Sequence, residues 1–413
     1  MKRLRGRTKR LLAAPAAVLL LLHAAVPQAA SAYMLNLVVA DMRQTASLSG
    51  GTSCPQPTRF DLSNFGSIAV QWSTNLGMHP TTILTANPPS DGQLDEIEET
   101  IDLSFFSWTN VPGSGLTTSS LSAIGRTSAQ NACAVDGQNT ICFNQSDPAF
   151  TTGVLAFTRI TTADVIGERA SATSAPSSFV GQVLDADILL RPADPSVTFA
   201  TPDELSSNPA AYDLESVLTH EIGHLLGFGH SAVWSAVMFP FVPAPGTFLG
   251  NRPSLQDRAA PLADDDRTAV RVLYPNPSDQ TYLGSISGRV LPVNPLALSG
   301  EPAGTTGIFA AQVVALNAST GAVAAAAISG WSCSDPGPPV FDGSYNIERL
   351  AVGANQAYQI YAEPLDGPVS PAAVFEQATI CRNASSDPGW PSQFACATPS
   401  PITTFSVGVH AGP

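Results

Sequence analysis

The chain has 413 residues, of which 44% are hydrophobic and 13% charged, so it is long enough for two globular domains and too apolar to be disordered. Lysine and arginine total 19 against 33 aspartates and glutamates, which gives a formal net charge of −14 at pH 7. This acidic balance argues against a nucleic-acid partner, because an acidic surface repels the phosphate backbone.

The beginning of the chain has the composition of a signal peptide. A basic segment, MKRLRGRTKR, precedes the apolar run LLAAPAAVLLLLHAAV and the small residues Ala30, Ser31 and Ala32. We predict cleavage after Ala32, since this order of segments is that of an export signal. An uncleaved anchor is the alternative, but Pro15 and His23 interrupt a run that is already short for a bilayer span. We therefore expect a secreted or periplasmic protein with no membrane span in the mature chain.

Export would make the mature chain more acidic and would favour disulfide bonds between its cysteines. Removing residues 1–32 leaves 13 basic residues, all arginine, and a net charge of −20. Six cysteines remain, an even number that suits disulfides in an oxidising compartment. Cys133 and Cys142 flank the turn-like AVDGQNTI and are predicted to pair. Three pairings stay open for the other four, which are Cys54, Cys333, Cys381 and Cys396.

Strands and helices are mixed between residues 60 and 278, which predicts an α+β domain. The expected strands are 68–72, 140–143, 153–160 and 179–190. The expected helices are 92–111, a second that begins between Ala211 and Leu214 and runs to Leu226, and 262–274. In the first helix one buried face is formed by apolar residues three to four positions apart, namely Ile97, Ile101, Phe105 and Trp108.

The segment HEIGHLLGFGH, residues 220–230, has the spacing of a zinc site. His220 and His224 lie four residues apart on one helical face, so both imidazoles can reach one ion. Gly227 can adopt a positive φ and end the helix, which lets His230 supply a third nitrogen. Three neutral imidazoles and an open fourth position are typical of a catalytic zinc.

Glu221 gives this site a general base. A bound zinc would lower the pKa of its water to about 7 and polarise a carbonyl, while Glu221 takes the water's proton and passes it to the leaving amine. The expected reaction is peptide-bond hydrolysis without a covalent intermediate. A thermolysin-like site with a downstream glutamate ligand is disfavoured, because His230 already stands at the third position. The alternative from another class is a surface adhesion or binding protein with a vestigial zinc domain.

This region resembles the metzincin metalloendopeptidases and, within them, the matrixin-type catalytic domain. Ser231 follows the third histidine as in matrixins, and Met238 within AVMFP resembles the Met-turn, whose methionine packs beneath the metal without binding it. Pro240 stands where astacins and serralysins place a tyrosine ligand, which favours a plain three-histidine site. The resemblance implies a twisted mixed sheet with three helices, one zinc, and protein or peptide substrates.

Two more segments carry the resemblance. LADDDRTAVRVLYP, residues 262–275, matches the closing helix of the family. GVLAFT, residues 153–158, is similar to the edge strand against which an extended substrate lies antiparallel. The second match implies that Leu155 and Ala156 lie at the substrate edge.

The sequence also departs from the family. No histidine occurs between His79 and His220, so the structural zinc of vertebrate matrixins is not expected. Asp185 and Asp187 in VLDADILL are interpreted as outward residues of a strand, with Ca²⁺, a second candidate cofactor, as the alternative. Cys54 in SCPQP shares the cysteine and a later proline with the latency motif P-R-C-G-x-P-D but lacks its arginine and glycine. A switch role and a disulfide both remain open for it.

Beyond residue 280 the sequence consists of strand-like segments rich in Val, Ala, Gly and Ser, separated by residues typical of turns. This pattern predicts an all-β sandwich. Segments such as SISGRVL resemble carboxypeptidase regulatory-like modules, which imply tethering or binding and no chemistry. The absence of lysine after residue 32 and the long basic segment at the start are typical of an exported bacterial protein. We expect the protein to be a monomer. The predicted division is signal peptide 1–32, lead segment 33–59, matrixin-like domain 60–278 and β-sandwich 280–413.

Overall fold

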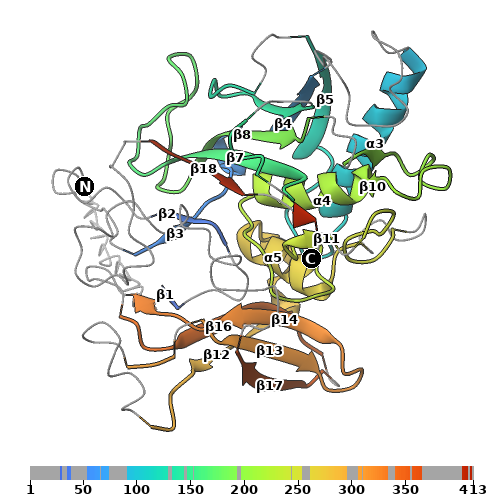
Figure 1. Ribbon diagram of the computed structural model, residues 1–413. Coiled ribbons are helices and arrows are strands. Elements are labelled where there is room, and N and C mark those ends of the chain that lie inside the picture. Colours follow the sequence, from blue (N-terminus) through green and yellow to red (C-terminus); the bar gives the residue numbers. More distant parts are fainter. Residues whose placement is uncertain are drawn as a thin grey trace, which may run out of the picture.

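A computed structural model of the chain (Figure 1) describes residues 28–29, 35–38, 54–65, 67–73, 91–128, 133–143, 147–151, 153–192, 197–242, 244–253, 261–294, 306–308, 310–333, 340–353, 356–364, 402–407 and 410–411. The predicted signal peptide lies outside these ranges except for residues 28–29. Cys381 and Cys396 also lie outside the described residues. None of the described helices combines the length and the apolar character that a membrane crossing requires.

A mixed sheet of six strands forms the centre of the first domain, in the order β18-β7-β8-β6-β4-β5 (Figure 1). The strands β5, β4, β6 and β8 run parallel to one another. β7 is antiparallel to β8 on one side and to β18 on the other. Alternate residues of β4 are buried, as a strand with one fully packed face requires. The bounds are β4 Ile68–Ser73, β5 Leu121–Thr127, β6 Asn139–Cys142, β7 Ala156–Ala163, β8 Val183–Leu190 and β18 Ile402–Val407.

Three main helices accompany this sheet, α3 (Asp91–Thr109), α4 (Leu214–Leu225) and α5 (Asp264–Leu273), besides a short α2 (Leu62–Phe65). The indole of Trp108 on α3 donates a 2.8 Å hydrogen bond to the carbonyl of Thr219 on α4. Every residue of α4 is buried. The mixed sheet with three helices confirms the predicted metzincin-type α+β fold of this domain.

Local contacts set the first residues of α4 and β8. α4 begins at Leu214, within the predicted range, because Tyr212–Asp213 form the short strand β10, which pairs with β9 (Phe199–Ala200). The Asp213 carboxylate then caps the helix by accepting from the backbone of Ser216 at 3.2 Å. β8 begins at Val183, four residues later than expected, because residues 179–182 form a turn.

After the 3₁₀-helix η1 (Pro277–Tyr282), the described strands between residues 283 and 363 form antiparallel sheets. One sheet pairs β12 (Leu283–Arg289) with β16 (Ser344–Ala351). The other has the order β14-β13-β17, with β13 Gln312–Asn317, β14 Val323–Ile328 and β17 Tyr358–Glu363. The resemblance of this region to a carboxypeptidase regulatory-like sandwich stays a prediction.

Several links tie the parts of the chain together. Cys54 forms a disulfide with Cys333, which lies in β15 (Ser332–Cys333), and β15 pairs with β1 (Gln28–Ala29). β18 lies beside β7 of the central sheet, although the sequence division assigns residues 402–407 to the second domain. A short pair, β2 (Leu37–Val38) with β3 (Gln56–Pro57), also holds the lead segment.

The two disulfides decide the open questions about cysteine pairing within the described residues. Cys133 pairs with Cys142, which confirms the prediction. The bond between Cys54 and Cys333 engages the sulfur that the latency motif would need, so the structure assigns Cys54 a disulfide role.

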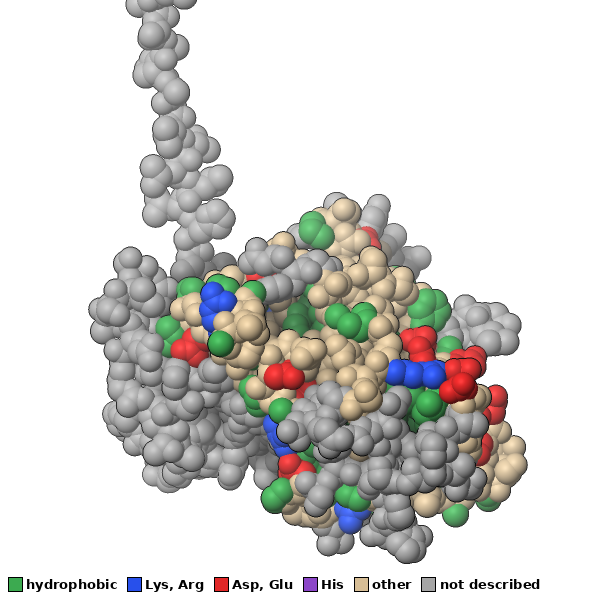
Figure 2. All heavy atoms as spheres, turned by 90° about the horizontal axis from the view of Figure 1, so that it is seen from above, with side chains coloured by type: hydrophobic (Ala, Val, Ile, Leu, Met, Phe, Trp, Pro, Cys, Tyr) green, Lys and Arg blue, Asp and Glu red, His purple; other side chains and the backbone are tan. Residues whose placement is uncertain are grey.

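Figure 2 shows how charged side chains are distributed over one face of the molecule. On the face drawn in Figure 2, the described arginines are scattered, and several lie beside acidic side chains. Arg126, for example, pairs with both Asp95 and Glu98 on α3.

Candidate metal centre

Three histidines meet at the end of α4. The Nε2 atoms of His220 and His224 lie 2.9 Å apart, as residues one turn apart on a helix allow. Gly227 has φ 105°, and a Cβ there would lie 2.1 Å from the carbonyl oxygen of Thr58, so only glycine fits this turn. The turn brings back His230, and one nitrogen from each histidine lies within 4.8 Å of the others.

Backbone carbonyls fix the orientation of the first two rings. His220 Nδ1 lies 2.6 Å from the carbonyl oxygen of Val237, and His224 Nδ1 lies 2.8 Å from that of Phe228. When each Nδ1 donates to its carbonyl, the Nε2 atoms carry the lone pairs that bind a metal. All three histidines are at most 1% exposed.

This donor set fits zinc. Three neutral imidazoles with bonds of about 2.0–2.1 Å are usual for a catalytic zinc, whereas Ca²⁺ prefers oxygen ligands. Within the described ranges, these histidines are the one group of three or more His, Cys, Asp or Glu side chains with ligand atoms so close. The helix and turn expected from the sequence thus bring together all three predicted ligands.

Glu221 lies next to the first histidine and is buried. The Thr158 hydroxyl on β7 is 2.7 Å from the Glu221 carboxylate and 3.0 Å from the Glu221 carbonyl, and it donates to both. Sequence reasoning missed Thr158, although it ends the quoted segment GVLAFT. Its hydrogen bond fixes the orientation of the Glu221 carboxylate.

Met238 lies beneath the helix as the Met-turn resemblance implies. A Cβ at Gly223 would lie 2.2 Å from the Met238 sulfur and 2.8 Å from the indole of Trp108, so the glycine allows this close approach. Trp108 in turn stacks on Phe228 with ring centroids 5.4 Å apart. The sulfur therefore packs against the helical turn between the first two histidines.

Asp266 on α5 holds the backbone of the Met-turn. Its carboxylate accepts from the N–H groups of Val237 and Met238 at 2.8 and 3.2 Å, and from that of Ala263 at 2.8 Å. Burial and the neighbouring Asp265 raise the pKa of Asp266 to about 7, although these bonds oppose the shift. The sequence predicted that the acidic residues at the start of α5 favour the helix. The structure adds that Asp266 also binds the backbone of the Met-turn.

Asp265 connects the site to the strands beyond residue 280. It accepts from the Ser231 hydroxyl at 2.6 Å and from the backbone of Ala326 on β14 at 2.7 Å. Burial raises its pKa to about 6. Val233 lies in the same small apolar cluster as Ala326, so the loop after His230 packs on the second region.

Comparison with known proteins agrees with this geometry. Residues 126–275 match the matrixin family of peptidases. The chain carries a matrixin-like metzincin catalytic domain. Metalloendoproteinase 1-MMP of Arabidopsis thaliana is 40% identical over 113 residues, which are 24% of this chain and 28% of that protein. Metalloendoproteinase 1 of Glycine max is 48% identical over 65 residues, 16% of this chain and 18% of that protein.

A third relative, Metalloendoproteinase 2-MMP of Arabidopsis thaliana, is 37% identical over 110 residues, 27% of this chain and 24% of that protein. The matches to these three relatives span at most 28% of their length. They therefore support the class of the matrixin-like domain, a zinc metalloendopeptidase, and leave the remaining regions to be argued from their own residues.

The predicted substrate edge lies at the start of β7. Leu155 and Ala156 are both fully buried. The Leu155 carbonyl accepts from the backbone of Arg191 at 2.9 Å, and Ala156 pairs with Leu190 of β8. These contacts hold one side of the segment to the matrixin-like sheet.

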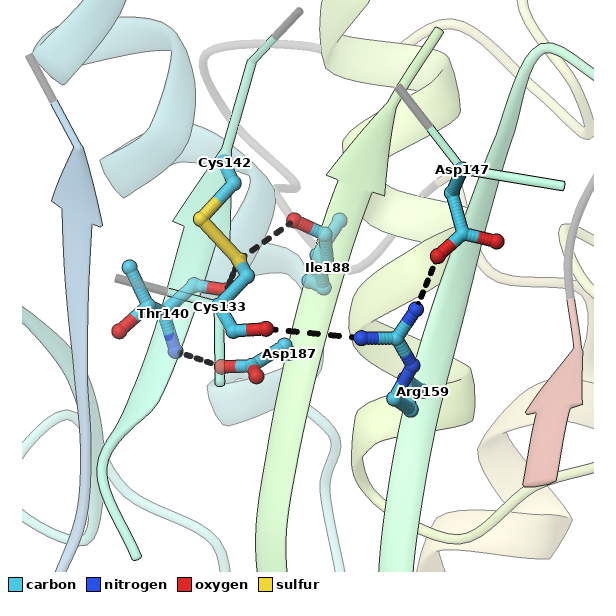
Figure 3. Close-up of a disulfide and its surroundings, with 7 residues drawn as sticks. All are labelled: Cys133, Thr140, Cys142, Asp147, Arg159, Asp187 and Ile188. Atoms are coloured by element: carbon cyan, nitrogen blue, oxygen red, sulfur yellow. Dashed lines mark hydrogen bonds and ion pairs between the residues drawn. A yellow bond between two sulfur atoms is a disulfide. The ribbon is translucent and has the colours of Figure 1, made fainter. Parts of the chain in front are cut away.

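Asp185 and Asp187 lie on β8, where the loop closed by the Cys133–Cys142 disulfide covers the sheet (Figure 3). Both are 0% exposed, so the interpretation of them as outward residues was wrong. One oxygen of Asp185 accepts from the backbone of Gly137 at 2.7 Å, and one of Asp187 accepts from that of Thr140 at 3.0 Å.

The second oxygen of each carboxylate, Asp185 Oδ1 and Asp187 Oδ2, is buried without a hydrogen-bond partner in the described part of the chain. Burial raises the pKa of Asp185 to about 6. Burial and the adjacent Asp185 raise that of Asp187 to about 9. Two orphaned oxygens from neighbouring carboxylates are the donor type that Ca²⁺ prefers.

Proposed function

We propose that this chain is an exported zinc-dependent endopeptidase that hydrolyses peptide bonds with Glu221 as the general base. The observation that carries the proposal is the buried trio of histidines, with the buried Glu221 next to His220 on the same helix. The matrixin match supports the same chemistry.

The roles of the residues follow from their contacts. A bound zinc, held by His220, His224 and His230, supplies Lewis acidity that activates water and polarises the scissile carbonyl. Glu221 accepts a proton from the water at its carboxylate and returns it to the leaving amine. The Thr158 hydroxyl holds that carboxylate at 2.7 Å during both transfers. Met238 supports the helix and touches no substrate.

The substrate is proposed to be a protein or peptide in extended conformation along the start of β7, at Leu155 and Ala156. Backbone pairing with an edge strand grips a chain with little dependence on its sequence, while pockets read alternate side chains. The acidic composition favours neutral or basic targets, since net charge steers association.

Secretion is part of the proposal. The two disulfides are consistent with an oxidising compartment. Signal cleavage after Ala32 would remove β1, which pairs with β15, and would leave the Cys54–Cys333 bond to hold the lead segment.

The test is cleavage of an unstructured protein by the zinc-loaded chain. Glu221→Gln keeps the shape and the acceptor for Thr158 but removes the base, so we expect a loss of about 10²–10⁴-fold in kcat with zinc still bound. His230→Ala should lose both zinc and activity. A chain that binds one zinc and cuts nothing, both at full length and when it ends at Pro401, would refute the endopeptidase and favour the adhesion or binding protein.

We also propose that Asp185 and Asp187 bind Ca²⁺, completed by backbone carbonyl or water oxygens. The orphaned buried oxygens of both residues support this, because a bound cation would satisfy carboxylate oxygens that have no hydrogen-bond partner in the described part of the chain. Ca²⁺ should raise the thermal midpoint of the wild type but not that of Asp187→Asn. Asp203→Asn, at an exposed position, is the control. An equal shift in Asp187→Asn, or none in the wild type, would contradict the site.

A further inference from the structure

The outer edge of the central sheet is covered by a strand from the far end of the sequence. β18 pairs antiparallel with β7, in a register that runs from Ile402 opposite Ala163 to Val407 opposite Thr158. The edge strand on which we place the substrate therefore has a neighbour from its own chain. In Figure 1 β18 lies directly beside β7.

The same segment then reaches the other side of the zinc site. β19 (His410–Ala411) pairs in parallel with β11 (Phe241–Val242). β11 begins three residues after Met238, so it directly follows the Met-turn. Residues 402–407 and 410–411 therefore pair with β7, which carries Thr158, and with β11, which follows the Met-turn.

The register places the end of β18 near a residue that contacts Glu221. Val407 lies opposite Thr158, whose hydroxyl donates to Glu221. Only two residues separate Val407 from His410, and three extended peptide units span about 10 Å. The end of β18 and the start of β19 therefore lie within about 10 Å of each other, the first paired with β7 and the second with β11.

We propose that residues 402–411 bind in the active-site cleft of their own catalytic domain, in the direction of a substrate, and block it. The inference rests on the proposed endopeptidase function. The antiparallel pairing with β7 is the one that the resemblance implies for a substrate, and backbone pairing to a sheet edge needs no particular side chains. The segment, ITTFSVGVHA, contains no Asp, Glu, Lys or Arg that would have to be desolvated.

Tethering makes this occupant hard to displace. A segment joined to its own cleft has an effective concentration on the order of millimolar, far above that of a substrate in the micromolar range. Inhibition of this kind is competitive, so removal of the segment should lower KM more than it raises kcat.

Three proteins test the proposal. The first ends at Pro401, and the second is the full chain with Thr403→Pro and Thr404→Pro. Alternate residues of an antiparallel strand donate to a given neighbour, so the two prolines remove at least one donor to β7 and stiffen the strand. The third ends at Ala411 and is the control. We expect kcat/KM to rise at least tenfold in the first two and to stay unchanged in the third.

A binding measurement separates this inference from the proposed function. A labelled ITTFSVGVHA peptide should bind the zinc-loaded chain that ends at Pro401, and should bind the full chain at least tenfold more weakly. Hydrogen exchange of the β7 amides should be faster in the first two proteins than in the control. Zinc content and thermal midpoints establish that each variant is folded.

The outcomes are distinct. If the chains cut substrate and neither kcat/KM nor peptide binding differs from the control, the inference is wrong and the endopeptidase stands. If peptide binding and exchange respond as expected while no chain cuts, the segment occupies the cleft and the proposed function is wrong. Faster exchange with unchanged kcat/KM in active chains also overturns the block, because β18 would then be only a structural strand.

Discussion

Replacing Gly223 with alanine should destabilise the zinc-loaded domain, although alanine is the better helix former. The new Cβ would lie 2.2 Å from the Met238 sulfur and 2.8 Å from Trp108 Cζ2. Met238 is 3% exposed and Trp108 is fully buried, so neither side chain can move into solvent. The helix must therefore shift away from the Met-turn, and His220 with it.

The magnitude follows from two opposing effects. Alanine in place of glycine inside a helix gains about 1 kcal/mol. Overpacking a filled interior costs about 1–3 kcal/mol, and two close contacts with buried groups favour the upper part of that range. The net loss of about 1–2 kcal/mol should lower the thermal midpoint by about 2–8 °C in a domain of this size.

The assay is thermal unfolding with and without zinc, together with zinc affinity from chelator competition. Gly92→Ala is the matched control, because it lies in α3 and a Cβ there meets nothing within 4 Å. It should be as stable as the wild type or slightly more stable. If Gly223→Ala matched Gly92→Ala in midpoint and in zinc affinity, the assigned packing of the Met-turn against α4 would be refuted.

Three further predictions follow from other contacts. Tyr274 donates to the Leu226 carbonyl at 2.7 Å, so Tyr274→Phe should cost about 1–3 kcal/mol in denaturant unfolding, and no change would contradict the role of that bond. Replacing Cys54 and Cys333 with serine should cost about 2–5 kcal/mol, and reductant should destabilise the wild type more than the variant, which keeps only the Cys133–Cys142 bond among the described disulfides. The pKa of Asp266 is raised from 3.8 to about 7, so the folded chain binds more protons than the unfolded chain between these values, and this carboxyl favours folding less as pH rises through that window. The stability of the wild type relative to Asp266→Asn should therefore fall between pH 4 and pH 7, and identical pH dependence of the two would argue against the shift.

The sequence alone determined the chemistry of the metal centre, because that chemistry depends on local geometry. Residues four apart share a helical face wherever a helix forms, so His220 and His224 could be paired before any fold was known. Gly227 predicted the turn that brings His230 back to the other two histidines, since glycine alone adopts a positive φ without strain. The disulfide between Cys133 and Cys142 was equally local, at nine residues' separation.

Only the tertiary structure decided which distant segments meet. Thr158 reaches Glu221 across 63 residues, and Cys54 joins Cys333 across 279, and nothing in the local pattern of either segment specifies its partner. Asp187 was open to an outward interpretation, because alternation along a strand does not tell which face another loop will cover. The edge of β7 accepts any strand that arrives with unpaired backbone groups, so its pairing with residues 402–407 depends on the packing of the whole chain.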